Sequence, residues 1–335
     1  MLKQMRLNKE TRKNHKIESL GEEHADMRPE VKLSQISMLG AHDAGTYQFS
    51  RKKAKGIDSL GTLFPGGFKC QSLSLVEQAQ AGVKYFDIRV KKGWAGKFRF
   101  FHEYSRTGND ALAEVMDLFN YAVNDKDNLY IFKMHFDKKD ADDFLRNFVI
   151  RYRRHLIYDY KGNDNDNECG NGKGDNNGQE GRPLGSFTVG ETLCRGKNIL
   201  IMVNHAEDSF KFSTASKYVW DYKGSAHSKW ANKASGKKTA KHILNFHGEM
   251  GFENKKISII QCNMPLRILP TPKSVKNLAK DEHRDVISAI NSIRRINEYL
   301  GVVSIDYVGR ENISSTGEIK ELIRTANRPL MKTAC

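Results

Sequence analysis

Two histidines that follow apolar runs are the first residues of this sequence that could do chemistry. His42 and Asp43 lie in GAHDAGTY (40–47), where the glycines allow a tight turn directly after an apolar run. His102 follows the apolar start of FRFFHEY (98–104). Imidazole titrates close to neutral pH, so one histidine can remove a proton while another donates one. The pair therefore indicates possible acid–base chemistry.

Three further charged residues occupy strand-like runs. Asp87 and Arg89 are two residues apart in FDIRV, which places both side chains on one face of a strand. Asp306 lies near the end of SIDYV. Asp87 and Arg89 alone could form a structural ion pair, and a lone histidine is more often a surface group than a catalytic one. Polar residues at the carboxyl ends of barrel strands are the usual catalytic positions, so the set as a whole favours a site.

The elements that must position these residues alternate between strand-like and helix-like segments. Helical periodicity is present in 111–124 and 281–300, where apolar residues line one face. This alternation predicts an α/β fold with a mostly parallel sheet, namely a single-domain, distorted TIM-type (β/α)8 barrel. No GxGxxG or GxxxxGK[ST] motif indicates a dinucleotide or P-loop site. The strand-like runs are 33–40, 84–90, 98–104, 128–136, 197–204, 256–262 and 301–308.

The composition is that of a globular protein. The 335 residues, 39% of them hydrophobic, suffice for one barrel, which needs about 250 residues. No stretch approaches the roughly 20 apolar residues of a membrane-spanning helix, and the start of the sequence lacks the apolar core of a secretory signal. We therefore expect a cytoplasmic protein or one that is peripheral to a membrane. The five cysteines are scattered without a CxxC pair, so neither a disulfide framework nor a zinc ribbon is indicated.

The charge is strongly positive and spread along the chain. Lys and Arg number 55 against 40 Asp and Glu, a net charge of +15, which favours anionic partners, although a solvated basic surface is the plain alternative. We expect residues 1–28 to form a basic flexible tail and residues 29–335 to form the barrel. The Gly-, Asn- and Asp-rich segment 161–185 is expected to be a disordered insertion. Its acidic residues are spaced as in an EF-hand, but Cys169 replaces the required glycine, so calcium is not expected there.

Three segments, in order, carry a resemblance to a known family. LSQISMLGAHDAGTY, CQSLSLVEQAQAGVKYFDIRV and the stretch from FRFFHEYS to IFKMHF resemble the X domain of phosphatidylinositol-specific phospholipase C, and look most like its bacterial members. The family pattern is a glycine, one residue and His-Asp or His-Asn, then an EQL-type helix with Ala-Gly, an Asp-Ile-Arg strand, and a second histidine after a short apolar strand. The likeness is dense over 33–136 and patchier to residue 327. It implies a distorted TIM barrel and a two-histidine phosphodiesterase that forms a cyclic phosphate.

The resemblance also implies roles for the matched residues. His42 would be the general base and His102 the general acid. Asp306 would orient one imidazole, that of His42, while Asp43 would support the acid-side imidazole. Arg89 would bind the phosphoryl oxygens and stabilise the charge that develops in the transition state.

Asp87 and Lys133 complete the expected site. Asp87 would pair with Arg89 or with the acid-side histidine, and Lys133 would lie near the phosphate. Calcium-dependent relatives carry a carboxylate where this sequence has Arg89, whose charge would repel a cation, so neither a metal nor another cofactor is expected. The second histidine is followed by Glu103 where the family has glycine, and Cys262 stands at the family's acidic headgroup contact. Phosphatidylinositol as the substrate is therefore inherited from the resemblance alone.

Two alternative functions stay open. One is a catalytically silent barrel that binds anionic lipid or nucleic acid, which would not need His42, Arg89, His102 and Asp306 together. The other is an enzyme of the glycerophosphodiester or sphingomyelinase D type, whose carboxylates cluster around Mg²⁺, and into such a cluster an arginine fits poorly. The expected partners are a phospholipid or another phosphodiester and an anionic membrane surface; nucleic acid is not expected.

Overall fold

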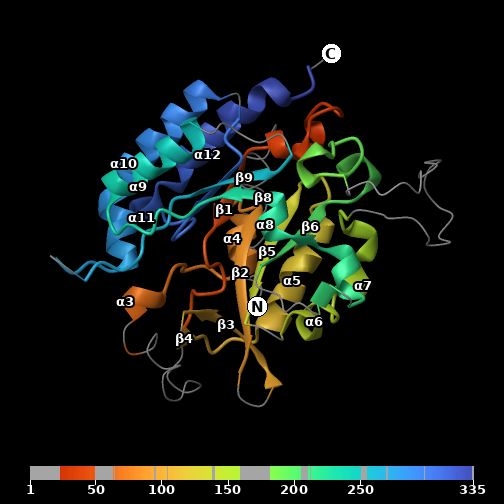
Figure 1. Cartoon of the computed structure of the whole chain (residues 1–335), viewed down its shortest axis with the longest axis horizontal. Helices are drawn as coiled ribbons and strands as arrows, with labels where there is room; N and C mark the ends of the chain where they lie inside the picture. The colour runs from red at the N-terminus through yellow and green to blue at the C-terminus, as the bar shows by residue number, and fades with distance from the viewer. Residues whose placement is uncertain are drawn as a thin grey trace, which may run out of the picture.

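The centre of the molecule is a curled sheet of parallel strands with helices wrapped around it (Figure 1). This arrangement confirms the expected distorted TIM-type barrel. The computed structural model describes residues 23–49, 63, 65–93, 96–103, 105–137, 140–158, 182–204, 210–211, 213–249, 255–268, 271–297 and 299–333.

Parallel strands follow one another in the order β7-β6-β5-β2-β1-β10-β9-β8. β1 lies near the middle and pairs along its whole length with β10, but with only two residues of β2. The ends of the order, β7 and β8, are joined in the chain by the short helix α8 (Tyr222–Ser225). The strand bounds are β1 (Met38–Ala41), β2 (Tyr85–Lys92), β5 (Tyr130–Phe136), β6 (Ile199–Asn204), β7 (Trp220–Asp221), β8 (Ala226–Ser228), β9 (Ile257–Gln261) and β10 (Val302–Ile305).

A hairpin leaves the barrel after β2. β3 (Phe98–His102) runs antiparallel to β2, and β4 (Ser105–Arg106) pairs with β3. The run 98–104 is therefore not a barrel strand, which corrects the sequence prediction. β2 extends to Lys92, well beyond its pairing with β1, and the chain then turns back on it. This return brings His102 toward the carboxyl ends of the barrel strands.

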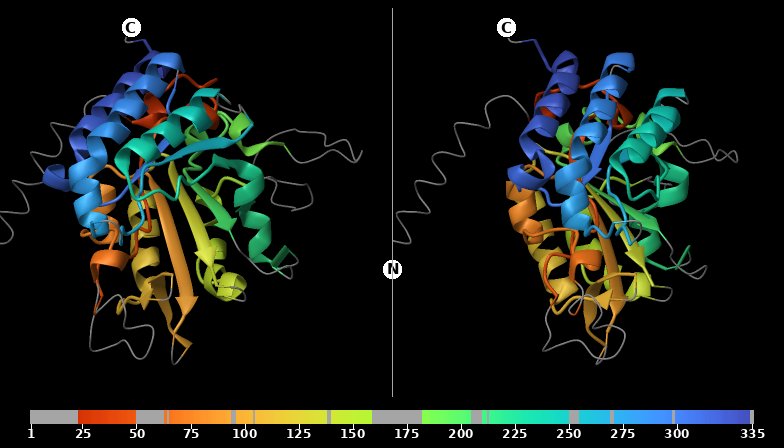
Figure 2. Two further views of the ribbon diagram at one scale, coloured as in Figure 1. Left: turned by 60° about the vertical axis from the view of Figure 1, so that its left-hand side comes forward. Right: turned by 90° about the vertical axis from the view of Figure 1, so that its left-hand side faces the viewer.

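Helices cover the outside of the sheet. α5 (Ala111–Asn124) coincides with the expected helix 111–124 and begins at Asp110, whose carboxylate accepts a hydrogen bond from the backbone N–H of Ala113. α10 (Val275–Ile296) starts and ends earlier than the expected 281–300, and lies beside α12 (Thr316–Asn327) in Figure 2. Among the described helices, none has the length and apolar character to cross a membrane. The other α-helices are α3 (Pro65–Phe68), α4 (Leu75–Gln80), α6 (Asp140–Leu145), α7 (Val149–Tyr152), α9 (Gly236–Ile243) and α11 (Glu311–Ser314).

Short 3-10 and π segments connect these elements. The 3-10 segments are η1 (His24–Asp26), η2 (Leu33–Gln35), η5 (Arg153–His155), η6 (Leu184–Ser186), η7 (Leu193–Arg195), η9 (Ala215–Tyr218) and η11 (Arg328–Leu330), and η10 (Leu244–Glu249) is a π-helix.

Two of the three apolar clusters among the described residues make up most of the barrel core. The larger cluster packs the outer face of the sheet against the helices, as where the rings of Phe119 in α5 and Phe132 in β5 stack with centroids 4.4 Å apart. The smaller cluster fills the interior near the amino ends of the strands and includes Tyr85 and Ile131. Burying each such side chain contributes roughly 1.5–3 kcal/mol to stability, so the strands hold a rigid frame beneath any site at their carboxyl ends.

The amino-terminal segment closes the interior cluster from below. Residues 1–22 of the expected tail lie outside the described residues. Within the described part, Met27 is fully buried and forms a β-bridge with Met331. The packed chain therefore begins before the expected boundary at residue 28, because Met27 completes the interior cluster.

The last residues of the expected insertion also pack into the barrel. Its stretch 161–181, with the EF-hand-like acidic positions, lies outside the described residues. Leu184 is buried in the interior cluster, and the backbone N–H of Gly185 donates to the carbonyl of Lys255 (3.0 Å). The last residues of the segment 161–185 are thus part of the barrel.

Candidate active site

His42 stands in the turn after β1 and is held by a carboxylate from β10's end. Its Nδ1 lies 2.8 Å from Oδ1 of Asp306, and both side chains are buried. Its backbone N–H donates to the carbonyl of Ile305. The side-chain amide of Gln71 donates to the carbonyls of His42 and Ile305, at 2.8 and 3.0 Å. The pairing of β1 with β10 therefore sets the contact between imidazole and carboxylate.

The neighbours of His42 also determine where its proton sits. Nη2 of Arg89 is 2.8 Å from Nε2 of His42, and the Asn263 side-chain nitrogen is 3.2 Å from the same atom. A guanidinium can only donate, so Nε2 carries the lone pair and Nδ1 carries the proton that it donates to Asp306. This is the tautomer in which Nε2 can act as a base.

His102 lies at the end of β3, facing His42. The two ring centroids are 6.3 Å apart and the ring planes are nearly perpendicular. Its Nδ1 is 2.9 Å from the carbonyl oxygen of Phe68 in α3 and 3.4 Å from Oδ2 of Asp43. Burial raises the pKa of Asp43, a shift that the Arg89 guanidinium opposes. A carbonyl oxygen can only accept, so Nδ1 of His102 carries a proton and donates it to Phe68, with the carboxylate of Asp43 close by.

Arg89 contacts His42 and lies beside two carboxylates, those of Asp87 and Asp43. Nη2 is 3.1 Å from Oδ2 of Asp87, and Nη1 is 3.6 Å from Oδ2 of Asp43. Lys133 Nζ contacts the other oxygen of Asp87 at 3.0 Å. Burial alone would raise the pKa of Asp87, but the Lys133 ammonium and the Arg89 guanidinium outweigh it and hold that pKa well below its usual range. Asp87 is thus the partner of Arg89 and Lys133, and its Oδ2 reaches Nε2 of His42 only at 4.0 Å.

The backbone around both histidines is held in unusual conformations. Asp43 and Glu103, each directly after a histidine, have φ of 44° and 51°, in the left-handed region. Such a conformation costs about 1 kcal/mol or more for a residue with a side chain. At Gly45, a Cβ would lie 2.2 Å from the ring of Phe100, so this turn position accepts only glycine.

Two groups of side chains in the described residues bring three possible metal-ligating atoms within 4.8 Å of one another. One is His42, Cys70 and Asp306, and the other is Asp43, Cys70 and His102. Each contains the Cys70 thiol, whose pKa is raised by burial. Neither offers the six to eight oxygens that Ca²⁺ takes.

Sequence reasoning missed Cys70 and Asn263. Cys70 Sγ lies 3.6 Å from Nδ1 of His102. Asn263 is buried two residues after β9, a strand-end position of the kind that barrels use for polar groups. That position was the available signal for Asn263. Nothing in the local pattern around Cys70 indicates that it faces a histidine.

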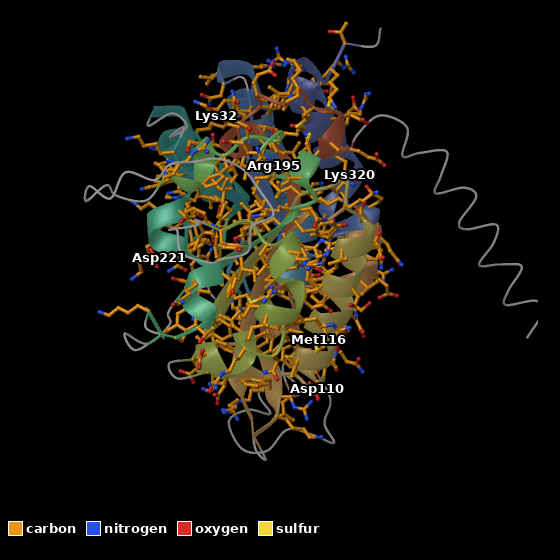
Figure 3. All side chains as sticks on the ribbon, turned by 90° about the vertical axis from the view of Figure 1, so that its right-hand side faces the viewer. Lys32, Asp110, Met116, Arg195, Asp221 and Lys320 are labelled. Carbon is orange, nitrogen blue, oxygen red and sulfur yellow. The ribbon has the colours of Figure 1, made fainter. Side chains whose placement is uncertain are left out.

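A separate cavity of about 740 Å³ lies at the other end of the barrel. It is lined by Lys84 just before β2, by Asn128 just before β5 and by Lys320 in α12. In Figure 3, Lys320 lies toward one end of the molecule, and Asp110, at the start of α5, lies toward the other. The histidines occupy the carboxyl ends of the strands, where barrel enzymes carry their chemistry.

Comparison with known proteins finds likeness in structure. The sequence matches no family model and no curated protein sequence. The phosphatidylinositol-specific phospholipase C from Listeria monocytogenes superposes with a TM-score of 0.62 at 16% identity, over 90% of this chain and 97% of that chain. A mutant of the phosphatidylinositol-specific phospholipase C from Staphylococcus aureus gives 0.58 at 15% identity, over 89% and 96%. At these identities the likeness shows that the chain has the phospholipase C-like barrel fold.

Proposed function

We propose that this protein is a phospholipase C-like phosphodiesterase in which His42 is the general base and His102 the general acid. The observation that carries the proposal is the pair of neighbouring imidazoles, each with an acceptor at Nδ1, and the guanidinium of Arg89 at Nε2 of His42. The barrel fold shared with phosphatidylinositol-specific phospholipases C supports the same reaction class.

In the first step, Nε2 of His42 removes the proton of a substrate hydroxyl next to the phosphodiester. That oxygen forms a bond to phosphorus, and His102 donates a proton to the leaving alkoxide oxygen as its bond to phosphorus breaks. The products are a cyclic phosphate and an alcohol such as diacylglycerol. Asp306, 2.8 Å from Nδ1, stabilises the imidazolium formed on His42.

Arg89 stabilises the charge on the phosphoryl group. Its Nε is buried without a hydrogen-bond partner among the described residues, while Nη2 is held by Asp87 and His42. A fixed donor aimed at the oxygens of the transition state lowers the barrier more than one that must reorganise. With Lys133 beside the same carboxylate, two cations already neutralise the site, which supports a reaction without a metal ion.

The rim around the site supports contact with an anionic phospholipid membrane. Trp230, after β8, and Leu266 and Ile268, after β9, are exposed at the carboxyl ends of the strands. The indole N–H of Trp230 donates to the carbonyl of Asn263, next to His42. Exposed apolar side chains among lysines, in a chain of net charge +15, match an anionic bilayer surface. We propose a phosphoinositide or a related phospholipid as the substrate.

Phosphorus NMR of the protein with vesicles of phosphatidylinositol and phosphatidylcholine tests the proposal. We expect a cyclic phosphate from phosphatidylinositol. His42→Ala and His102→Ala should each lower turnover by at least about 100-fold, with His242→Ala, on α9 and outside the site, as the matched control. Folded variants of both histidines that keep turnover close to that of the wild type would overturn the assignment. An active protein whose activity EDTA abolishes and Mg²⁺ restores would favour the metal-dependent class.

A further inference from the structure

We infer that the acid side of the site also forms an inhibitory site for a thiophilic metal ion, Zn²⁺ or Cd²⁺, with Sγ of Cys70, Nδ1 of His102 and Oδ2 of Asp43 as ligands. The inference rests on the proposed function, because it assigns a way of switching that site off. The proposed reaction uses His102 and Asp43, but it does not use the thiol of Cys70, so the three residues together form a separate set of ligands.

Two of the three distances among the ligand atoms fit a tetrahedral zinc ion, and the third, between Sγ and Oδ2, is within 4.8 Å. With Zn–S about 2.3 Å and Zn–N and Zn–O about 2.05 Å, tetrahedral angles place S and N about 3.6 Å apart and N and O about 3.4 Å apart. Sγ of Cys70 is 3.6 Å from Nδ1 of His102, and Oδ2 of Asp43 is 3.4 Å from the same nitrogen. Two edges of the tetrahedron therefore already have the lengths that a bound zinc ion requires.

The second group of possible ligands fits less well. In His42, Cys70 and Asp306, the imidazole nitrogen and the carboxylate oxygen are only 2.8 Å apart. That is a hydrogen-bond length, and a metal ion would have to push the two atoms apart by about 0.6 Å to reach a tetrahedral edge. The acid-side group needs no such movement along its two measured edges.

Asp43 gives an independent sign of an unfilled position. It is fully buried, and neither of its carboxylate oxygens has a hydrogen-bond partner among the described residues. A buried carboxylate normally finds hydrogen bonds or a cation at close range, whereas the two nitrogens nearest to Oδ2, Nδ1 of His102 and Nη1 of Arg89, stay at 3.4 and 3.6 Å. A metal bond to Oδ2 would supply what this oxygen lacks.

The chemical types of the three ligand atoms determine which metal ion binds. A thiolate and an imidazole select zinc-like ions over Mg²⁺ and Ca²⁺, which prefer oxygen. Binding breaks the S–H bond of Cys70 and forms a metal–sulfur bond, with the proton released to solvent. The imidazolium of His102 likewise releases its Nδ1 proton to solvent and keeps the proton on Nε2, and the hydrogen bond to the carbonyl of Phe68 is lost. The negative charge gained by the thiol offsets the repulsion between the ion and Arg89.

Inhibition follows because the metal occupies the nitrogen that Asp43 and Phe68 use to support a protonated imidazole. A neutral, metal-bound imidazole is a far weaker acid than an imidazolium, so His102 no longer protonates the leaving oxygen. Zn²⁺ should therefore lower turnover, and a chelator should restore it.

The test follows Cd²⁺ binding by its thiolate-to-metal absorption in the near ultraviolet, and diesterase activity in the presence of Zn²⁺. All proteins carry Cys169→Ser, Cys194→Ser and Cys335→Ser, so that Cys70 and Cys262 are the thiols left. Cys70→Ser and Cys70→Ala are compared with Cys262→Ser, a buried cysteine outside both ligand groups.

We expect the absorption band at one Cd²⁺ per chain in the parent and in Cys262→Ser, and no band in either Cys70 variant. Zn²⁺ should lower activity at least about tenfold in the first two proteins, reversibly with EDTA, and less than about twofold in the Cys70 variants. A band that persists without Cys70, or undiminished activity in saturating Zn²⁺, overturns the inference. A Cys70-dependent band in a protein without diesterase activity would leave the metal site standing and reject the proposed function instead.

Discussion

Replacing Arg89 by methionine removes the fixed cation of the site and keeps much of the side chain's volume. In the proposed transition state, the guanidinium faces a phosphoryl group that has gained negative charge. Two unit charges about 4 Å apart interact by about 4 kcal/mol at an effective dielectric constant near 20. Because each 1.36 kcal/mol changes a rate tenfold, Arg89→Met should lower kcat/KM by about 10³-fold.

The surroundings of Arg89 indicate that this variant will fold. Asp87 loses the contact at 3.1 Å but keeps Lys133 at 3.0 Å, and Asp43 loses the guanidinium at 3.6 Å but keeps Nδ1 of His102 at 3.4 Å. Arg89→Lys keeps the charge and loses the planar fork, so its activity should lie between those of the wild type and Arg89→Met. Arg99→Met is the matched control, because Arg99 in β3 donates to the carbonyl of Gly108, away from the histidines.

The assay is initial-rate cleavage of phosphatidylinositol in mixed micelles after dialysis against EDTA, with melting temperatures recorded for every variant. We expect wild-type activity to survive the dialysis, and Arg99→Met to stay within about twofold of it. If Arg89→Met loses less than about tenfold while folded, the guanidinium is not the main stabiliser of the transition state. If EDTA stops the wild type and a divalent cation restores it, Arg89 does not take the place of a metal ion.

Three further predictions concern the carboxylates and the insertion. Asp306→Asn should lower kcat by about 10²–10⁴-fold with little change in KM, because the base loses the charge that holds its tautomer. A raised KM with an unchanged kcat would contradict this role. Asp87→Asn should lower the free energy of unfolding at pH 7 by about 3 kcal/mol in urea titrations. Because the folded pKa of Asp87 is depressed, its stabilisation is present above the ordinary carboxylate pKa of about 4 and is lost as pH falls below that value, so the deficit should shrink in acid; an equal deficit at pH 7 and pH 3 would argue against it. Deleting 161–180 should leave the melting temperature unchanged, whereas deleting 161–185 should lower it by several degrees, because Leu184 is buried; equal melting temperatures would show that Leu184 adds no stability.

Much of the barrel could be predicted because its strands are apolar on both faces. Six of the seven predicted runs contain barrel strands. One of the six is the run 301–308, which contains β10, the last strand, as expected. β7 and β8 were not predicted, since two or three residues are too few to show a periodicity. The antiparallel pairing of β3 with β2 could not be predicted either, because the pattern of apolar residues in a strand does not show whether it runs parallel or antiparallel to its neighbour.

The site was predictable where a residue type sits at the end of a strand. His42 and Asp306 are brought together by the register of β1 and β10, and both stand in recognisable runs. Cys70 reaches His102 through the fold of the segment before α4, which has no pattern of its own. The contact of Asp87 with Lys133 rests on the register between β2 and β5, which apolar runs do not fix.

The pairing of β1 with β10 has a consequence for how the protein is made. β1 is synthesised first, but it finds only two partner residues in β2 and must wait for β10, near the end of the chain, to pair along its whole length. A chain still on the ribosome therefore carries an unsatisfied strand edge for most of its synthesis. The carboxylate of Asp306 arrives with that last strand. The base of the proposed reaction is consequently assembled only when the sheet is completed. A truncated or partly folded chain would have His42 but not the carboxylate that makes it a base.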